Sequence, residues 1–143
     1  MKFQIIWIGI QNVVKSFIEY IPQIKYLTCA HCRRLLCVIL PLVVNEENIW
    51  IVLYIDKKRR GEYFDSLGRC PFEHFKILLD VNCVEWIWNE RQIQSVINKL
   101  CGHYCIFYCL YRSRGLDVRK IVGMFTKDTG LNDSMVHNFV CNV

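Results

Sequence analysis

The sequence predicts an α+β protein in which a small mixed sheet packs against one buried helix. Two segments carry this prediction. Residues 49–55 (IWIVLYI) are almost continuously apolar and rich in β-branched and aromatic side chains, as expected of an inner strand that is covered on both faces. Residues 101–111 (CGHYCIFYCLY) instead repeat apolar side chains at helical spacing, with Cys101, Cys105 and Cys109 along one side.

The length and composition fit one domain with a packed core, since the chain has 143 residues of which 53% are hydrophobic. We divide it into a divergent N-terminal segment, residues 1–42, which we expect to be helical, and a main domain, residues 43–143. The apolar stretch at 3–10 predicts an amphipathic helix rather than a signal sequence, because no small-residue cleavage site follows it. The apolar run at 35–44 contains a proline and is too short to span a bilayer, so it predicts a buried strand or a helix-to-strand crossing.

The middle of the chain reads as a hairpin followed by a helix and a further strand. After 49–55, a charged turn leads to a second strand that ends at Asp65. Pro71 suits the first turn of a helix over 72–79. Residues 84–88 alternate as a strand and lead into a loop that carries Gln94.

The last third of the chain predicts three helices. Basic residues and Gly115 signal the end of the helix that starts near Cys101. Two short helices are expected at 118–125 and 135–140, the second capped by Asn132 or Asp133.

The start of the 101–111 helix has the features of a thiol nucleophile. Unpaired amide groups and the positive end of the helix dipole favour thiolate over thiol, and Gly102 adds no side chain beside the sulfur of Cys101. The side-chain amide of Gln94, seven positions upstream, can donate to an oxyanion near that sulfur. Asp65, at a strand end, either points into a cleft beside Cys101 or serves as an ordinary turn or capping carboxylate.

Four motifs together resemble a known family. Trp50 on its strand, residues 63–68 (YFDSLG), residues 94–95 (QS) and residues 101–105 (CGHYC) look like the adenoviral-protease and ubiquitin-like-modifier protease group of papain-like cysteine peptidases. The chain is most similar to the adenain-type proteases of double-stranded DNA viruses and of Polinton-type DNA transposons. The resemblance covers about positions 43 to 140, including a tail at 128–133 (DTGLND).

This resemblance implies a papain-like fold and assigns roles to particular residues. Cys101 would be the nucleophile, Asp65 the carboxylate that orients a histidine, and Gln94 the donor to the oxyanion. Trp50 and Gly102 would line the substrate cleft.

One part of the family pattern is missing. The catalytic histidine of the family stands immediately before the tryptophan, and Ile49 occupies that position here. The loop before it also looks shorter than the family's, as a small deletion, a missing exon or a sequence error would make it. An isoleucine accepts no proton, so the thiol loses both its base and the acid that protonates the leaving amine.

No other histidine is expected to replace the missing base. His103 follows Cys101 by two residues, and such positions point to different sides of a helix. No motif directs His31, His74 or His137 toward the cleft.

We therefore predict a cysteine peptidase-like protein that is impaired or inactive. Its chemistry would be acyl transfer through Cys101 on a peptide or a ubiquitin-like protein. The alternative is a non-catalytic relative, either a peptide-binding protein or a decaying copy derived from a transposon or virus.

The cysteine content predicts a reducing, intracellular location, either cytoplasmic or nuclear. The nine cysteines are odd in number, and several lie at helical spacing among apolar residues, so thiols are expected rather than a disulfide scaffold. The cluster of Cys29, His31 and Cys32 has no second ligand pair, so neither a structural zinc site nor another cofactor is expected.

The charge pattern is mild, with 18 Lys and Arg against 13 Asp and Glu. A basic run is compatible with a weak contact to nucleic acid, although a solvated hairpin tip explains it equally well. The residues of this run are Lys57, Lys58, Arg59 and Arg60. We expect a monomer that does not associate with membranes.

Overall fold

The computed structural model describes the backbone of residues 36–44 and 47–142 and the side chains of residues 49–142. The predictions for the helix at 3–10, for His31 and for the cysteines at 29 and 32 lie outside the described residues. Among the described residues, no helix is both long enough and apolar enough to cross a bilayer.

A four-stranded mixed sheet forms the centre of the molecule, in the order β1-β2-β3-β4. The first three strands are antiparallel neighbours, and β4 runs parallel to β3. The strands are β1 (Leu36–Val44), β2 (Glu47–Ile55), β3 (Arg60–Phe64) and β4 (Glu85–Trp88). The helices are α2 (Glu73–Asn82), α3 (Cys101–Ser113), α4 (Val118–Gly123) and α5 (Thr129–Cys141). The predicted α+β class is confirmed.

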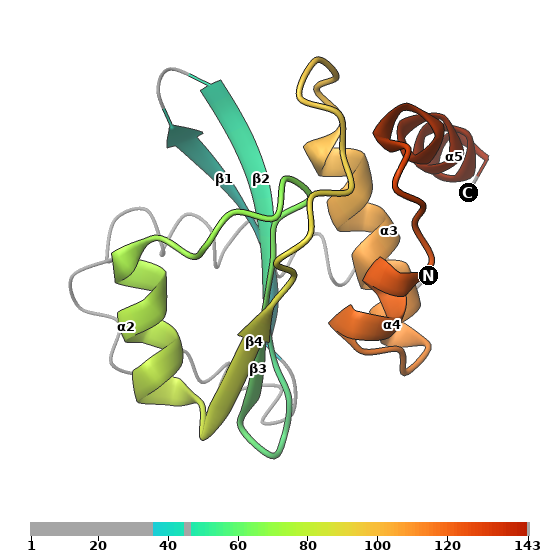
Figure 1. The fold of residues 1–143 in the computed structure, drawn as a ribbon. Coiled ribbons are helices and arrows are strands. Elements are labelled where there is room, and N and C mark those ends of the chain that lie inside the picture. Colours follow the sequence, from blue (N-terminus) through green and yellow to red (C-terminus); the bar gives the residue numbers. More distant parts are fainter. Residues whose placement is uncertain (1–35, 45–46, 143) are drawn as a thin grey trace.

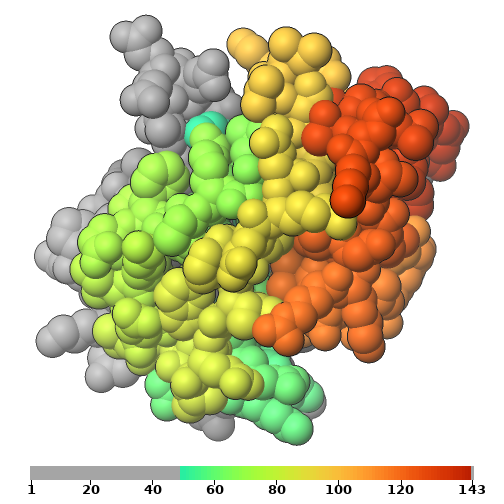
Figure 2. Space-filling view, viewed as in Figure 1, coloured from blue at the N-terminus to red at the C-terminus, as the bar shows by residue number. Residues whose placement is uncertain are grey.

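The helices cover the two faces of the sheet unequally. Helix α2 lies on one face, and α3 lies on the other with α4 and α5 beyond it (Figure 1). The segment between β4 and α3 runs across the surface between these two sides, as the yellow atoms in Figure 2 show. Each face therefore has its own core of buried side chains.

Strand β2 is apolar along its length because it contributes to both cores. Ile49, Ile51 and Leu53 belong to the core on the α2 face. Val52 belongs to the core on the α3 face, and Trp50 packs against that core. The alternation follows from the period of two along a strand, and it directs position 49 and position 50 to opposite faces.

The parallel pairing of β3 with β4 requires a crossover, which α2 supplies. Gly61 allows this crossover to approach β3 closely, because a Cβ atom at this position would lie 2.5 Å from the sulfur of Cys83 and 3.0 Å from the Cβ of Trp86. Pro71 lies two residues before the first residue of α2 rather than within its first turn as predicted, since Phe72 is the N-cap. The chain enters the helix later because Phe72 has an extended backbone.

A buried carboxylate ties β3 to α3. Glu62 accepts a short hydrogen bond from the hydroxyl of Tyr108, and the Nε of Arg112 lies 3.3 Å from the same carboxylate oxygen. The guanidinium of Arg112 also stacks over the ring of Tyr54, 4.1 Å from its centroid. Burial raises the pKa of Glu62, and the hydrogen bond from Tyr108 and the charge of Arg112 oppose that shift.

The start of α5 differs from the prediction. The helix begins at Thr129, and its N-cap is Asp128, whose side chain accepts from the backbone N–H of Leu131. Asn132 and Asp133 are not caps, because both are buried within α5 and bond to other segments of the chain. Polar residues that resemble a cap in the sequence here make tertiary contacts instead.

The predicted boundary between the N-terminal segment and the main domain, at residue 42, falls within a strand. Strand β1 (Leu36–Val44) continues across that position and pairs with β2 over its whole length. Residues 36–44 of the predicted run 35–44 therefore form a strand, one of the two alternatives predicted. The division itself stays a prediction, since residues 1–35 lie outside the described part.

The basic run of residues 57–60 forms the exposed tip of the β2–β3 hairpin, as predicted. Asp56 holds this tip by accepting from the backbone N–H groups of Lys58 and Arg60 and by pairing with the Arg60 guanidinium. A contact with nucleic acid at this tip stays a prediction.

Replacing Tyr63 by phenylalanine is expected to stabilise the protein by about 1 kcal/mol. The Tyr63 side chain is fully buried, and its hydroxyl has no hydrogen-bond partner among the described residues, so the substitution removes a desolvated polar group. Urea unfolding measures the effect. Tyr104→Phe is the matched control and should be destabilising, because that hydroxyl bonds to Asp133 at 2.8 Å and to the carbonyl of Ile93 at 3.2 Å. Equal losses for both variants would contradict the assignment.

Glu62→Gln is expected to remove a pH dependence of stability. Burial raises the pKa of Glu62 in the folded state above the unfolded value, so the folded state binds the proton more tightly. Stability of the natural protein should therefore fall, relative to Glu62→Gln, as the pH rises from the ordinary glutamate range through the raised pKa. Unfolding free energies across that pH range test this prediction, and parallel curves for the two proteins would contradict it.

Candidate functional site

Cys101 is the first residue of α3, so it lies in the first turn of the helix, as the sequence predicted. Leu100 is the N-cap and supplies no side-chain hydrogen bond, although its carbonyl accepts from the backbone N–H of Tyr104. The Cys101 side chain is 9% exposed. A thiol in this position meets the backbone N–H groups of the first helical turn, which stabilise negative charge.

Trp50 lies against the first turn of α3. A Cβ atom at Gly102 would lie 3.8 Å from the Cδ1 of Trp50 and 3.9 Å from its Cγ. A Cβ atom at position 102 would therefore be in ordinary van der Waals contact with the indole. The two residues expected to line a substrate cleft are neighbours, one from β2 and one from α3.

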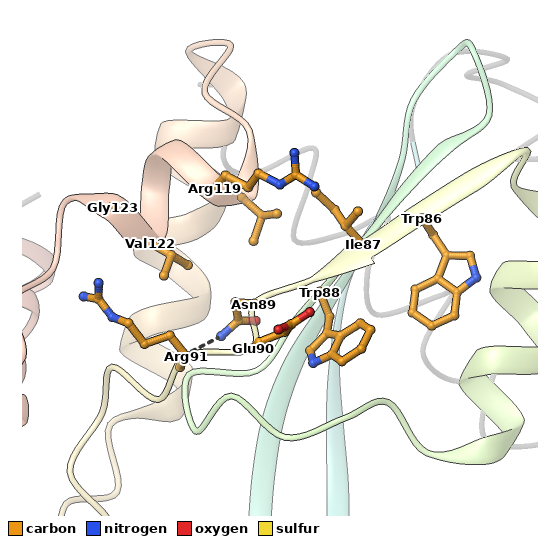
Figure 3. A pocket seen from close by; sticks show the side chains of 10 residues that line it. Trp86, Ile87, Trp88, Asn89, Glu90, Arg91, Arg119, Val122 and Gly123 are labelled. Atoms are coloured by element: carbon orange, nitrogen blue, oxygen red, sulfur yellow. Dashed lines mark hydrogen bonds between the residues drawn. The ribbon is translucent and has the colours of Figure 1, made fainter.

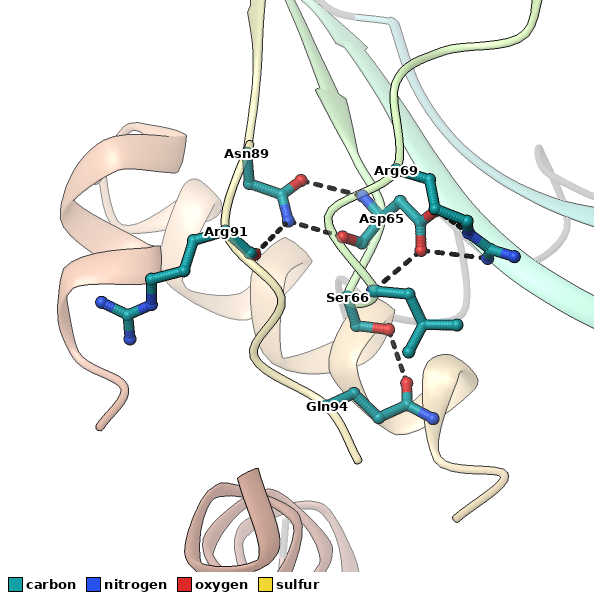
Figure 4. A network of polar contacts seen from close by, with 7 residues as sticks. Asp65, Ser66, Arg69, Asn89, Arg91 and Gln94 are labelled. Carbon is teal, nitrogen blue, oxygen red and sulfur yellow. Dashed lines mark hydrogen bonds and ion pairs between the residues drawn. The ribbon is translucent and has the colours of Figure 1, made fainter. Parts of the chain in front are cut away.

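Asp65 follows β3 directly, and its carboxylate is almost fully buried, with 1% exposure. Its Oδ2 accepts from the Nε of Arg69 at 2.7 Å, and its Oδ1 accepts from a terminal nitrogen of Arg69 at 3.3 Å. The backbone N–H of Leu67 donates to Oδ1 at 3.0 Å. Figure 4 shows the Arg69 guanidinium facing this carboxylate, so an arginine is the charged partner of Asp65.

Asn89 fixes the backbone of Asp65. Its Oδ1 accepts from the Asp65 N–H at 2.9 Å, and its Nδ2 donates to the Asp65 carbonyl at 2.5 Å (Figure 4). Asn89 follows β4, so this amide replaces the strand pairing that ends one residue earlier. The position of Asp65 is set by its neighbouring strand as well as by its ion pair.

Gln94 bonds to the residue after Asp65. Its Oε1 accepts from the hydroxyl of Ser66 at 2.6 Å, and its Nε2 donates to the carbonyl of Asn98 at 2.5 Å. Gln94 is buried, and its own backbone N–H and that of Ile93 donate to the carbonyl of Ser66. The loop at Ile93 and Gln94 is therefore held to Ser66 by three hydrogen bonds, one of which is made by the side-chain amide of Gln94.

The loop that carries Gln94 is anchored to α3 and α5. The Tyr104 hydroxyl donates to the carbonyl of Ile93 and to the carboxylate of Asp133. Asp133 also accepts from the backbone N–H of Ser95 and from the Asn98 side chain. Tyr104 lies three positions after Cys101 in α3, so these contacts connect the Asp65 and Gln94 network to the helix of Cys101.

Position 49 offers no group for proton transfer. Ile49 is 4% exposed and packs in the core on the α2 face with Ile51 and Leu53. The isoleucine at position 49 is therefore fully accommodated in the hydrophobic core.

The rings of the described histidines contact residues of α3, of α5 and of the α2 region. The ring of His103 is 5.6 Å from that of His137, which places it toward α5. His74 packs against Phe72 and Phe75 on α2, where burial lowers the pKa of its imidazole. The expectation that His103 points away from Cys101 agrees with its contact on α5.

The sequence predicted Cys101, Asp65 and Gln94 as candidate site residues. It did not predict the residues that hydrogen-bond to Asp65 or anchor the Gln94 loop. Arg69 has a signal in the sequence, since it follows Asp65 by four positions within a tight turn. Asn89 and Asp133 have no comparable local signal, because their partners are 24 and 29 or more positions away in the chain.

A pocket of about 470 Å³ lies elsewhere, between β4 and α4, and Cys101 is not among its lining residues. Ile87 faces α4, whereas Trp86 and Trp88 point to the other side of the strand (Figure 3). Arg119 and Val122 close the pocket from α4. This pocket is thus separate from the thiol.

A scan against protein-family models found no match, and a search of curated proteins also found none. Among solved structures, the ASFV pS273R protease aligns with 73% of this chain, with a TM-score of 0.58 and 16% sequence identity. This chain has the fold of a viral protease. The predicted fold, α+β of the papain-like cysteine-peptidase type, is thereby confirmed. At this identity the likeness concerns the fold alone, and this chain spans 43% of the length of the ASFV protease.

Arg69→Ala is expected to destabilise the protein by about 2–3 kcal/mol, because it leaves the buried Asp65 carboxylate without its charged partner. The Arg69 side chain is 35% exposed, which lowers the expected loss below that of a fully buried pair. Arg60→Ala is the matched control: it breaks an ion pair of the same spacing with Asp56, but its side chain is 53% exposed, so a much smaller loss is expected. Equal losses in urea unfolding would contradict the role of Arg69.

Proposed function

We propose that this chain is a cysteine peptidase-like protein whose thiol site has lost its base and is therefore impaired or inactive in amide hydrolysis. Cys101 is the nucleophile of this site, Gln94 the oxyanion donor, and Asp65 the carboxylate that formerly oriented an imidazole. The observation that carries the proposal is that Asp65, buried at the end of β3, pairs with Arg69 while position 49 is a buried isoleucine.

The placement of the thiol supports a nucleophilic role. Cys101 stands at the N-terminus of a 13-residue helix, where a thiolate and an acyl oxyanion both meet partial positive charge. A primary amide has two N–H donors, and Asn98 takes one from Gln94. The second N–H is the donor that we assign to the oxyanion.

The Asp65 ion pair supports the loss of the base. In a Cys–His–Asp arrangement, the carboxylate accepts from the imidazole and holds it toward the thiol. Here both oxygens of Asp65 accept from Arg69, and a guanidinium cannot act as a base because it stays protonated. Amide cleavage needs a proton on the leaving nitrogen, and neither Ile49 nor Arg69, at the two positions described here, would deliver it.

The substrate that we propose is a peptide or the tail of a ubiquitin-like protein, in line with the resemblance of the motifs. Trp50 and Gly102 form the part of the cleft nearest Cys101, where a flat indole beside a bare glycine suits a narrow, extended chain. The kinship with adenain-type and Polinton-type proteases, the monomeric state and the intracellular location remain part of the same proposal.

A second candidate function is peptide binding without catalysis. The same Asp65–Arg69 pair favours it, because a stable ion pair in place of the catalytic dyad leaves the fold and the Trp50 contact intact. A copy under decay would instead be expected to lose the buried polar network around Asn89 and Gln94, which is complete here.

Restoring the base tests the proposal. The β2–β3 register ends at the pair Val52–Phe64, and its continuation directs position 49 to the same face as Asp65, which is the α2 face, whereas Trp50 packs toward α3. The variant therefore also tests whether an imidazole at position 49 reaches Cys101 around β2. Ile49→His alone should give little turnover, because Arg69 retains the carboxylate. The double variant Ile49→His with Arg69→Gln should cleave fluorogenic peptide amides at a rate about tenfold or more above the natural chain.

Two controls define the outcome of this experiment. Cys101→Ala in the double variant must abolish the activity, and Asp65→Asn must reduce it, since the new imidazole then loses its orienting partner. Rapid amide cleavage by the natural chain would contradict the loss of the base. A folded double variant that binds peptide but never cleaves it would favour the binding function.

A further inference from the structure

We propose that His103, His137 and Cys141 form a binding site for a single zinc-class metal ion that fastens α5 to α3. One donor atom from each residue lies within 4.8 Å of the others. The sulfur of Cys141 is 3.8 Å from Nε2 and 3.9 Å from Nδ1 of His137. The inference concerns a site separate from the catalytic groups and does not depend on whether Cys101 is active.

The spacing of the donors is close to that of a tetrahedral site. Zinc bonds to sulfur and imidazole nitrogen imply donor separations of about 3.3–3.6 Å in tetrahedral geometry. Cys141 and His137 already approach this separation, and the 4.8 Å limit leaves little more than 1 Å to close by side-chain rotation. No movement of either helix is required.

The positions of the residues explain how the donors converge. His137 and Cys141 are four residues apart in α5, so they share one face of that helix. His103 comes from the first turn of α3, and its ring lies 5.6 Å from the ring of His137. The site therefore joins two helices through residues that lie 34 or more positions apart in the sequence.

The donor set selects the class of metal. Two imidazoles and a thiolate favour zinc over magnesium or calcium, which prefer oxygen ligands. His137 and Cys141 are exposed, and His103 is partly exposed, so an ion can reach the donors from solvent. Three protein ligands leave a fourth position, which water or another ligand fills.

A metal in this position acts on the loop that carries Gln94. Asp133, one turn before His137 in α5, accepts from Tyr104, Ser95 and Asn98. Fastening α5 to the first turn of α3 would hold these contacts, and Asn98 in turn accepts from Gln94. The metal would thus rigidify the surroundings of the site without touching Cys101.

The test is metal titration of the full-length chain after chelator treatment, with Zn²⁺ followed by calorimetry and Co²⁺ followed by absorption. The natural protein should bind one more equivalent than His137→Gln or Cys141→Ser, or bind it at least about tenfold more tightly. Its Co²⁺ complex should show a thiolate-to-metal charge-transfer band that Cys141→Ser lacks. Zn²⁺ should also raise the melting temperature of the natural protein more than that of either variant.

Controls separate this site from other thiols and imidazoles. Cys70→Ser and His74→Gln change exposed residues of the same types far from α5 in the sequence and should leave binding unchanged. Metal held by Cys29, His31 and Cys32 would give equal stoichiometry in the natural chain and in the α5 variants. Equal stoichiometry, affinity and Co²⁺ spectra for natural protein, His137→Gln and Cys141→Ser would overturn the proposal. Circular dichroism verifies folding, and His137→Asn with Cys141→Ala provides a second pair of variants.

Discussion

Helix α3 packs against the face of β2 that carries Trp50, Val52 and Tyr54, and the rest of this fold depends on that contact. Tyr104 and Tyr108 are fully buried in this layer, and each uses its hydroxyl to bind a buried carboxylate, Asp133 from α5 and Glu62 from β3. The helix is therefore fixed in rotation as well as in position. Cys101 is the first residue of this helix, and Trp50 of β2 lies against the next residue, Gly102.

A second constraint is the cost of burying Asp65. A carboxylate with 1% exposure requires donors, and a papain-like site normally supplies an imidazole. Here Arg69 and the backbone N–H of Leu67 satisfy it, so an isoleucine at position 49 leaves no unpaired charge. In the proposed function, the same arginine is what keeps the fold stable without a histidine at this position. Under that proposal the stability of this site is separate from its activity.

The sequence predicted the parts of the fold that local pattern determines. The apolar run of β2, the hairpin tip at 57–60 and the helix that begins at Cys101 follow from periodicity and turn chemistry. The start of α5 was wrong by several residues, because Asn132 and Asp133 serve distant segments and resemble caps only locally. Asn89 was not predicted for the same reason, since its partner Asp65 lies 24 positions away. Arg69 differs, because it follows Asp65 by only four positions and this spacing is a local signal.

The most direct test of the central claim compares an activated ester and an amide of the same acyl peptide. An activated ester releases a leaving group that needs no proton, whereas an amide does need one, so the comparison isolates the missing base. Mass spectrometry should find the acyl group on Cys101 after reaction with the ester, and the amide should remain essentially uncleaved, at a rate about four orders of magnitude below that of an intact triad. Efficient amide cleavage would contradict the loss of the base, and the absence of acylation at Cys101 would contradict its role as the nucleophile.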